Sequence, residues 1–337
     1  MNAHPKIVLA GSVNSSYQTL KKLHEHNMNV VHVFALHPVK SEQVSGYKDL
    51  KILAAELGIP ATYFRDINNA EVVQLIEREH VDILFVVGLS QIVKASLLSA
   101  PNHGCIGFHP TMLPKGRGRA AIAWTILKNL TPAVTFFKLD RGADSGPILE
   151  QIPIELDSNE YPLTLIEKIK STIDVALDEL LPKLKEGKMN PKPQDHTKAT
   201  FLGVRREEDG YIQWKASAED VHKLIRASSH PYPGAYSFVN GEKIKIYSAT
   251  LRPEFTGVSG RVIAVEQGNP IITCAEGAIE FSLNGKRYFH EDASKLIYQP
   301  KLGDIVFFPS SLYHRTIPFT SDTDRIIVSF DLMPKVI

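Results

Sequence analysis

Short apolar runs alternate with amphipathic stretches through the first half of the chain. Five runs have the continuous apolar character of strands buried on both faces. These runs are residues 6–13, 30–36, 81–88, 104–110 and 133–140. Four other stretches place apolar residues three and four positions apart, the spacing of one helix face; they are residues 15–26, 47–58, 70–80 and 118–129. This alternation predicts an α/β fold with an open, mainly parallel, Rossmann-like sheet.

The pattern changes twice further along the chain. Apolar residues recur at helical spacing from Leu163 to Leu184, which predicts one long amphipathic helix on the sheet. A proline-rich polar stretch follows, and then one helical stretch, 217–228, stands among alternating strand-like runs, which predicts a small β domain. The last part is rich in aromatic strand patterns. We therefore divide the chain into a first domain (1–190), a linker (191–204), a small β domain (205–275) and a β-rich tail (276–337).

Composition and charge narrow the possible classes. The chain has 337 residues, with 38 basic against 37 acidic side chains. The chain therefore has no extended positive electrostatic field that would attract polyanions, and a nucleic-acid partner is not expected. No apolar run approaches the roughly 18 residues of a membrane-spanning helix, and the first residues lack a signal-peptide layout, so we expect a cytoplasmic protein without a membrane partner. Cys105 and Cys274 lie in separate apolar stretches, which favours buried free thiols over a disulfide.

The stretch "GCIGFHPTMLPKGRGRAAIAW" brings a histidine to the end of a predicted strand. Ligands of open α/β sheets bind beyond the carboxyl ends of the strands, where His109 would lie. Asp140 and Asp144 follow another strand-like run, and a carboxylate that reaches an imidazole fixes its tautomer for acid–base catalysis. The spacing is equally compatible with a loop histidine and a turn-forming aspartate. The first 275 residues contain no residue spacing typical of metal ligands, a phosphate-binding loop or a serine hydrolase. No metal is therefore expected.

The stretches "FHPTMLPKGRGRAAIAW" and "AVTFFKLDRGADSGPI" resemble the 10-formyltetrahydrofolate-dependent formyltransferases. The resemblance runs from about residue 6 to residue 275 and implies a Rossmann-like catalytic domain followed by an OB-like domain. It also implies 10-formyltetrahydrofolate as co-substrate, with His109 as the catalytic histidine and Asp144 as the catalytic aspartate that acts on it through an ordered water. One position departs from the family, since Gly107 stands where an asparagine normally donates to the formyl oxygen. We expect another donor there: protonated His109, a water or a backbone N–H.

The motifs "RGRAAIAW" and "GADSGPI" look closest to the branch of this family that formylates nucleotide-linked amino sugars. The residues that this likeness assigns to the folate are Gln91, Ile92, Val93, Arg119, Asp140, Arg141, Gly142 and Ala143. Arg117 and Arg119 are also compatible with solvated residues at a helix start. The expected acceptor is an amino-sugar precursor of lipopolysaccharide or another surface glycan, and a homodimer is a possible assembly. The alternative is an enzyme like methionyl-tRNA formyltransferase, which the near-neutral charge disfavours.

The tail resembles a different family. Residues 277–334 are similar to the second half of a 2-oxoglutarate/Fe(II) oxygenase barrel, where His314 matches an iron ligand and Arg325 the arginine that pairs with 2-oxoglutarate. An iron site of this type also needs an earlier His-x-Asp pair. His290 and Asp292 have that spacing but lie where the oxygenases have a loop. We therefore interpret the spacing of these two residues as chance. The tail is expected to be a structural or dimerising β module. An oxygenase with a silent folate-binding domain is the alternative.

Overall fold

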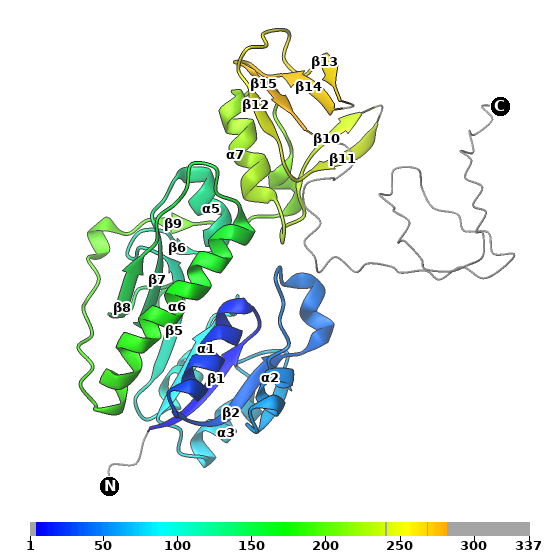
Figure 1. Cartoon of the computed structure of the whole chain (residues 1–337). Coiled ribbons are helices and arrows are strands. Elements are labelled where there is room, and N and C mark those ends of the chain that lie inside the picture. Colours follow the sequence, from blue (N-terminus) through cyan, green and yellow to red (C-terminus); the bar gives the residue numbers. More distant parts are fainter. Residues whose placement is uncertain (1–4, 240, 268, 282–337) are drawn as a thin grey trace, which may run out of the picture.

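The computed structural model describes residues 5–239, 241–267 and 269–281. Its centre is a seven-stranded sheet with the order β3-β2-β1-β4-β5-β7-β8 (Figure 1). The strands are β1 (Lys6–Gly11), β2 (Asn29–Leu36), β3 (Ala61–Phe64), β4 (Ile83–Val87), β5 (Cys105–Thr111), β7 (Pro132–Lys138) and β8 (Ile148–Pro153). The first five are parallel to one another. The predicted α/β sheet is thereby confirmed, and all five predicted strands are present.

The last two strands of the sheet run in the opposite direction. Strand β7 is antiparallel to β5, with Ile106 opposite Lys138 and His109 opposite Thr135, and β8 is antiparallel to β7. The carboxyl end of β7 therefore lies beside the beginning of β5 and not beside its end. An apolar run buried on both faces has the same pattern in either direction, so the sequence did not show this reversal.

Helices cover both faces of the sheet. Side chains of α1 (Asn14–Glu25), α2 (Leu50–Glu56) and α6 (Pro162–Lys185) share one apolar core, and those of α3 (Ala70–Arg78) and α4 (Ala95–Ser99) share the core on the other face. Helix α5 (Ala121–Lys128) begins three residues later than the predicted stretch. The reason is that Arg117 and Gly118 form a short strand, β6, before the helix.

Helix α6 is the long amphipathic helix that the spacing of Leu and Ile predicted. Its fully buried face contains Leu165, Ile173, Leu177, Leu180 and Leu181, which pack on the core shared with α1. Burial of each such side chain contributes about 2 kcal/mol relative to an exposed position. This face therefore holds the helix along the whole sheet (Figure 1).

The second part of the molecule is rich in short antiparallel strands and has its own core. Helix α7 (Ala218–Ser228) starts at Ser217, whose side chain accepts a hydrogen bond from the backbone of Asp220. It packs beside two small sheets (Figure 1). Their strands are β10 (Ala235–Val239), β11 (Glu242–Ile246), β12 (Thr250–Arg252), β13 (Val262–Glu266), β14 (Asn269–Thr273) and β15 (Ala278–Glu280). The predicted β-rich region is confirmed, and the residue limits of the domains stay a prediction.

The predicted linker returns to the first part of the chain. Strand β9 (Phe201–Leu202) pairs with β6 (Arg117–Gly118). Three short 3₁₀ helices complete the elements: η1 (Pro38–Gln43), η2 (His196–Lys198) and η3 (Glu207–Gly210). The linker is therefore bonded to the loop that follows His109, which matters for the site described below.

Both cysteines are free and buried, as expected. Burial raises the pKa of the Cys105 thiol to about 12 and that of the Cys274 thiol to about 11. Both side chains stay protonated at neutral pH and act as small apolar residues.

Candidate active site

His109 lies near the end of β5 with a buried side chain that is only 5% exposed. Side chains alternate along a strand, so Gly107 and His109 face the same side as Cys105, which packs in the core beside α3 and α4. His109 Nε2 lies 2.7 Å from the carbonyl oxygen of Gly116. A carbonyl only accepts, so Nε2 carries the hydrogen, and Nδ1 is the basic nitrogen of the neutral ring.

The loop after β5 directs that carbonyl at the imidazole. Thr111 Oγ1 donates to the carbonyl of Lys115 at 2.8 Å, which curls the loop back toward β5. Gly116 has a φ of +75°, and a Cβ there would lie 3.1 Å from Thr111 Cγ2. The glycine is required both by this conformation and by the close approach to Thr111.

Asp144 faces the other nitrogen of the ring. Its Oδ2 lies 3.6 Å from His109 Nδ1 and accepts a hydrogen bond from the backbone N–H of Gly118 at 2.7 Å. The structure thus brings together the pair that the motif indicated. At 3.6 Å the two groups are placed for a direct ion pair once the imidazole is protonated. The ordered water expected between them stays a prediction.

Asp144 reaches His109 by an indirect route. It belongs to the 139–147 loop between β7 and β8, and this loop begins beside the start of β5, where Leu139 N donates to Cys105 O at 2.9 Å. From there the loop follows β5 over the four residues from Cys105 to His109, roughly 13 Å, to place Asp144 against His109. Asp144 itself has a φ of +49°, in the left-handed region that most side chains avoid.

Leu139 fills the space beside Gly107. A Cβ on Gly107 would lie 2.5 Å from Leu139 Cδ2 and 3.1 Å from Phe137 Cζ. A side chain at position 107, such as the asparagine that the resemblance leads one to expect there, would therefore require Leu139 to move. The expectation of another donor stays a prediction.

The residues predicted to hold the folate lie in two segments on either side of β5, apart from Arg119, which lies in the loop between β6 and α5. Gln91 has both side-chain groups bound to the chain, since Oε1 accepts from Ile67 N at 2.7 Å and Nε2 donates to Arg65 O at 2.9 Å. Its neighbour Ile92 is 82% exposed, an apolar surface next to the strand end. Asn68, which the sequence did not single out, fixes this segment by donating to Ile92 O at 3.0 Å.

The second segment is the 139–147 loop. Asp140 Oδ1 accepts from Gly142 N at 2.9 Å and from Ser145 Oγ at 2.6 Å, so this carboxylate shapes the loop. Arg141, Gly142 and Ala143 are exposed. Arg119 is also exposed, and its backbone N–H donates to Leu202 O at 3.1 Å. Residues 141–143 and Arg119 are thus exposed and accessible to a ligand.

Arg117 is buried, so the interpretation of this residue as a solvated helix-start residue is wrong. Its guanidinium donates to Gln194 Oε1 at 3.2 Å from Nε and at 2.6 Å from Nη2. Nη2 also lies 3.2 Å from His196 Nδ1. Both partners belong to the linker, where a polar, proline-rich composition had given no sign of a structural role.

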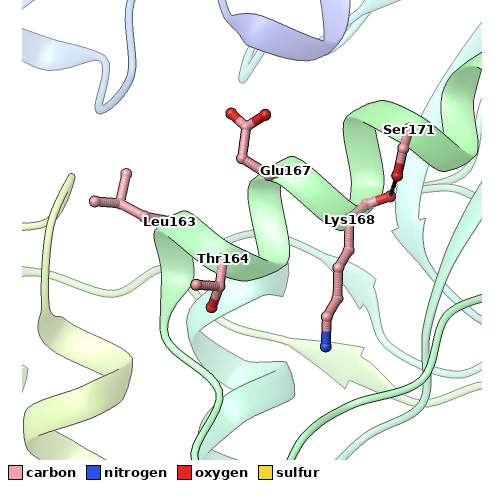
Figure 2. A pocket seen from close by; sticks show the side chains of 5 residues that line it. All are labelled: Leu163, Thr164, Glu167, Lys168 and Ser171. Carbon is pink, nitrogen blue, oxygen red and sulfur yellow. Dashed lines mark hydrogen bonds between the residues drawn. The ribbon is translucent and has the colours of Figure 1, made fainter. Parts of the chain in front are cut away.

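A hollow on the surface of the described residues lies away from this site. It measures about 400 Å³ and is lined by Leu163, Thr164, Glu167, Lys168 and Ser171 on α6 (Figure 2). Helix α6 covers the sheet face opposite to the one that His109 faces. The hollow is therefore separated from the histidine by the sheet.

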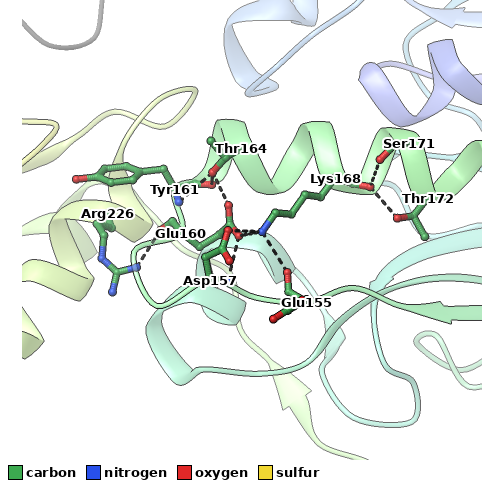
Figure 3. A network of polar contacts seen from close by, with 9 residues as sticks. All are labelled: Glu155, Asp157, Glu160, Tyr161, Thr164, Lys168, Ser171, Thr172 and Arg226. Atoms are coloured by element: carbon green, nitrogen blue, oxygen red, sulfur yellow. Dashed lines mark hydrogen bonds and ion pairs between the residues drawn. The ribbon is translucent and has the colours of Figure 1, made fainter.

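A polar network at the start of α6 joins the two parts of the chain (Figure 3). Lys168 Nζ pairs with Asp157 at 2.7 Å and with the buried carboxylate of Glu160. Burial alone would lower the pKa of Lys168, but its hydrogen bonds to these carboxylates raise it overall. Arg226 of α7 donates to the carbonyl of Glu160 at 2.9 Å. These contacts are structural, and they fix the second part against α6.

Residues 5–239, 241–267 and 269–281 contain no group of three or more His, Cys, Asp or Glu side chains arranged to hold a metal ion. His290, Asp292, His314 and Arg325 of the tail lie outside the described residues. Among the described helices, none combines the length and the apolar character needed to cross a membrane.

Three family models match the chain. The formyl transferase model matches residues 6–179, and the model for the formyl transferase C-terminal domain matches residues 205–286. The model for a putative 2OG-Fe(II) oxygenase matches residues 265–331, which overlaps the C-terminal domain and extends through the tail.

Curated relatives include two methionyl-tRNA formyltransferases. The protein from Geobacter metallireducens is 30% identical over 287 residues, which cover 83% of this chain and 92% of the relative. The protein from Geotalea uraniireducens is 31% identical over 292 residues, with coverage of 85% and 92%.

Two solved structures with the same fold were determined in complex with a folate compound. The N-formyltransferase from Helicobacter canadensis, in complex with folinic acid and dTDP-3-aminofucose, has a TM-score of 0.64 and 19% identity, covering 82% of this chain and 98% of its own. HypX from Aquifex aeolicus, in complex with tetrahydrofolic acid, has a TM-score of 0.59 and 18% identity, covering 83% of this chain and 44% of its own. With both of its domain models matched and relatives at 30% identity across most of its length, the chain belongs to the formyl transferase family, whose enzymes transfer formyl groups and use 10-formyltetrahydrofolate.

Proposed function

We propose that this protein moves a formyl group from 10-formyltetrahydrofolate to the amine of a nucleotide-linked amino sugar. The observation that carries the proposal is the pairing of His109 Nδ1 with the Asp144 carboxylate at 3.6 Å, beside two exposed segments suited to a folate. The sugar is supported by the "RGRAAIAW" and "GADSGPI" motifs and by the near-neutral charge. Structures of the same fold include enzymes named as a sugar 3N-formyl transferase and a 4-N formyltransferase from Francisella tularensis. A cytoplasmic location, a role in glycan assembly and a homodimer remain part of the proposal.

The residues divide the chemistry among them. When bound, 10-formyltetrahydrofolate would supply the formyl carbon that the amine attacks, and the bond from this carbon to N10 would break to release tetrahydrofolate. Ile92 offers an apolar surface to a pteridine, and the exposed 141–143 backbone offers polar groups. Gly116 fixes the ring so that Nδ1 is free to take the proton that the attacking amine loses. Asp144 stabilises the resulting imidazolium, whose positive charge stabilises the developing negative charge in place of a side chain at position 107. The Nδ1 proton then passes to N10 of the leaving tetrahydrofolate, which restores the neutral ring.

The pair is tested by His109→Ala and Asp144→Asn. Each change should lower kcat by at least roughly 10²-fold, because each removes a group from proton transfer. The double variant should be little worse than the poorer single variant, because the two side chains act as one unit. Rates are measured by mass spectrometry of the formylated product. A near-normal rate in either single variant would remove that residue from the mechanism.

A second candidate acceptor is methionyl-tRNA, which the names of the sequence relatives favour. The purified full chain is incubated with 10-formyltetrahydrofolate and either dTDP- and UDP-linked amino sugars or methionyl-tRNA. We expect formylated sugar and no formylated tRNA. Formylated tRNA alone would overturn the sugar assignment and leave the formyltransferase assignment intact.

A further inference from the structure

Gln194 joins three segments of the candidate site, although it lies in the predicted linker. The residue is 6% exposed. Its Nε2 donates to Asp144 O at 2.9 Å and to Gly146 O at 2.7 Å. Its Oε1 accepts both hydrogen bonds from the Arg117 guanidinium. Two donors and two acceptor sites are all that a side-chain amide has, so every one of them is used.

Asp144 depends on such support because its backbone is in the left-handed region, with a φ of +49°. Residues in that region persist where their surroundings determine the conformation. Here Gln194 holds the Asp144 carbonyl, and Gly118 N–H holds its carboxylate. The direction of the carboxylate toward His109 is therefore fixed from both ends of the residue.

Arg117 extends the hydrogen-bond network of Gln194 to the loop after β5. It lies between Gly116, whose carbonyl binds His109, and Gly118, whose N–H binds Asp144. Its own backbone N–H donates to Thr200 O at 2.9 Å. Movement of the Gln194 amide would therefore disturb the partners of His109 and Asp144 together.

We propose that Gln194 is a positioning residue, which holds Asp144 and the 116–118 loop so that the carboxylate faces His109 Nδ1. The proposal rests on the proposed function, because it assumes that this pair performs formyl transfer. Gln194 touches neither His109 nor a substrate in this assignment, and it acts through the Asp144 backbone and Arg117.

The Gln194→Glu variant tests the hydrogen bonds that Gln194 Nε2 donates to the 139–147 loop. The carboxylate keeps the shape and the contact with Arg117 but turns the donor toward Asp144 O into an acceptor, which repels the carbonyl. We expect kcat to fall roughly 10- to 100-fold with KM for both substrates changed less than about threefold, because misplacement affects the reacting geometry more than binding. The matched control is Gln18→Glu, since the buried amide of Gln18 on α1 binds Asp174 of α6 away from the site. That variant should lower the melting temperature while kcat of the folded enzyme is retained.

A double-mutant cycle separates positioning from general stability. In an Asp144→Asn background, Gln194→Glu should cause little further loss of kcat, because its effect passes through Asp144. If Gln194→Glu does not fold, Gln194→Met is used in the same cycle with the same expectation. Multiplied losses in the double variant, or an unchanged kcat in a folded Gln194 variant, would overturn the proposal. A normal kcat for Asp144→Asn alone would instead remove Asp144 from the mechanism and overturn the proposal for Gln194, while the formyltransferase assignment stands. The absence of formylated sugar with the wild-type chain would contradict the proposed function.

Discussion

His109 and Gly107, two residues apart on β5, show how a formyltransferase site is organised without its asparagine. The two ring nitrogens of His109 have separate partners, the Gly116 carbonyl for Nε2 and the Asp144 carboxylate for Nδ1. Leu139 occupies the volume beside Gly107. Leu139 is half-buried, and we interpret its position as a site built around the glycine rather than one that has simply lost a side chain.

Gly107→Asn tests whether the oxyanion already has a donor. We expect kcat to be unchanged or lower, because Leu139 must rotate away and the new amide meets a site packed without it. Gly107→Ala is the control, since its Cβ displaces Leu139 without adding a donor. A site that lacks a donor would instead recover part of the roughly 3–4 kcal/mol that one can supply. A rise in kcat of tenfold or more for Gly107→Asn, measured in the formylation assay, would contradict our expectation.

Strands and helices differ in how far their sequence predicted them. The five buried strands and the long helix α6 were predicted because their apolar patterns are continuous, whereas the edge strands β3 and β8 are largely half-buried or exposed and lack such runs. The reversed direction of β7 has no sequence signal. The motif nevertheless indicated the His109–Asp144 pair, while the chemistry of the linker stayed hidden because Gln194 stands alone among polar and proline residues.

Helix α7 contains a histidine that should make folding sensitive to pH. His222 is 8% exposed, and burial, together with the neighbouring Arg226, lowers its pKa from 6.5 to about 4. The unfolded chain therefore binds this proton at a higher pH than the folded chain does. The stability that neutral His222 contributes is complete above about pH 6.5 and is lost as the pH falls toward 4, with an upper limit of about 3 kcal/mol.

The matching experiment compares urea unfolding of the wild-type chain and His222→Gln from about pH 7.5 to about pH 4.5. The variant should lose less stability on acidification, by on the order of 2 kcal/mol. Burial also lowers the pKa of His32 and His230, and both residues are present in each protein, so the difference between the two curves isolates His222. Identical slopes would show that His222 titrates alike in the folded and unfolded chains.

In the molecule as a whole, the described residues form three apolar cores, two on the faces of the large sheet and one in the second part. The parts are joined by the β6–β9 pairing and by the network of Arg226 and Glu160 (Figure 3). All the residues of the candidate site lie between residues 91 and 202. The formyl transferase models end at residue 286, before most of the oxygenase-like match.

Formyl transfer should therefore not require residues 287–337. A chain that ends after residue 286 is expected to keep kcat/KM within about threefold of the full chain, because both formyl transferase models end by residue 286 and changes outside a site usually act independently of it. The same truncated chain with His109→Ala serves as the inactive control. Strand β13 exposes Val262, Ile263 and Val265 in the described part of the chain, so self-association is checked by light scattering in parallel. A truncated chain that still unfolds cooperatively but has lost formyl transfer would show that the tail contributes to the active enzyme.

The tail match is interpreted as lacking a complete iron triad. In an assay with Fe(II) and 2-oxoglutarate, the full chain should therefore release no more succinate than it does without iron.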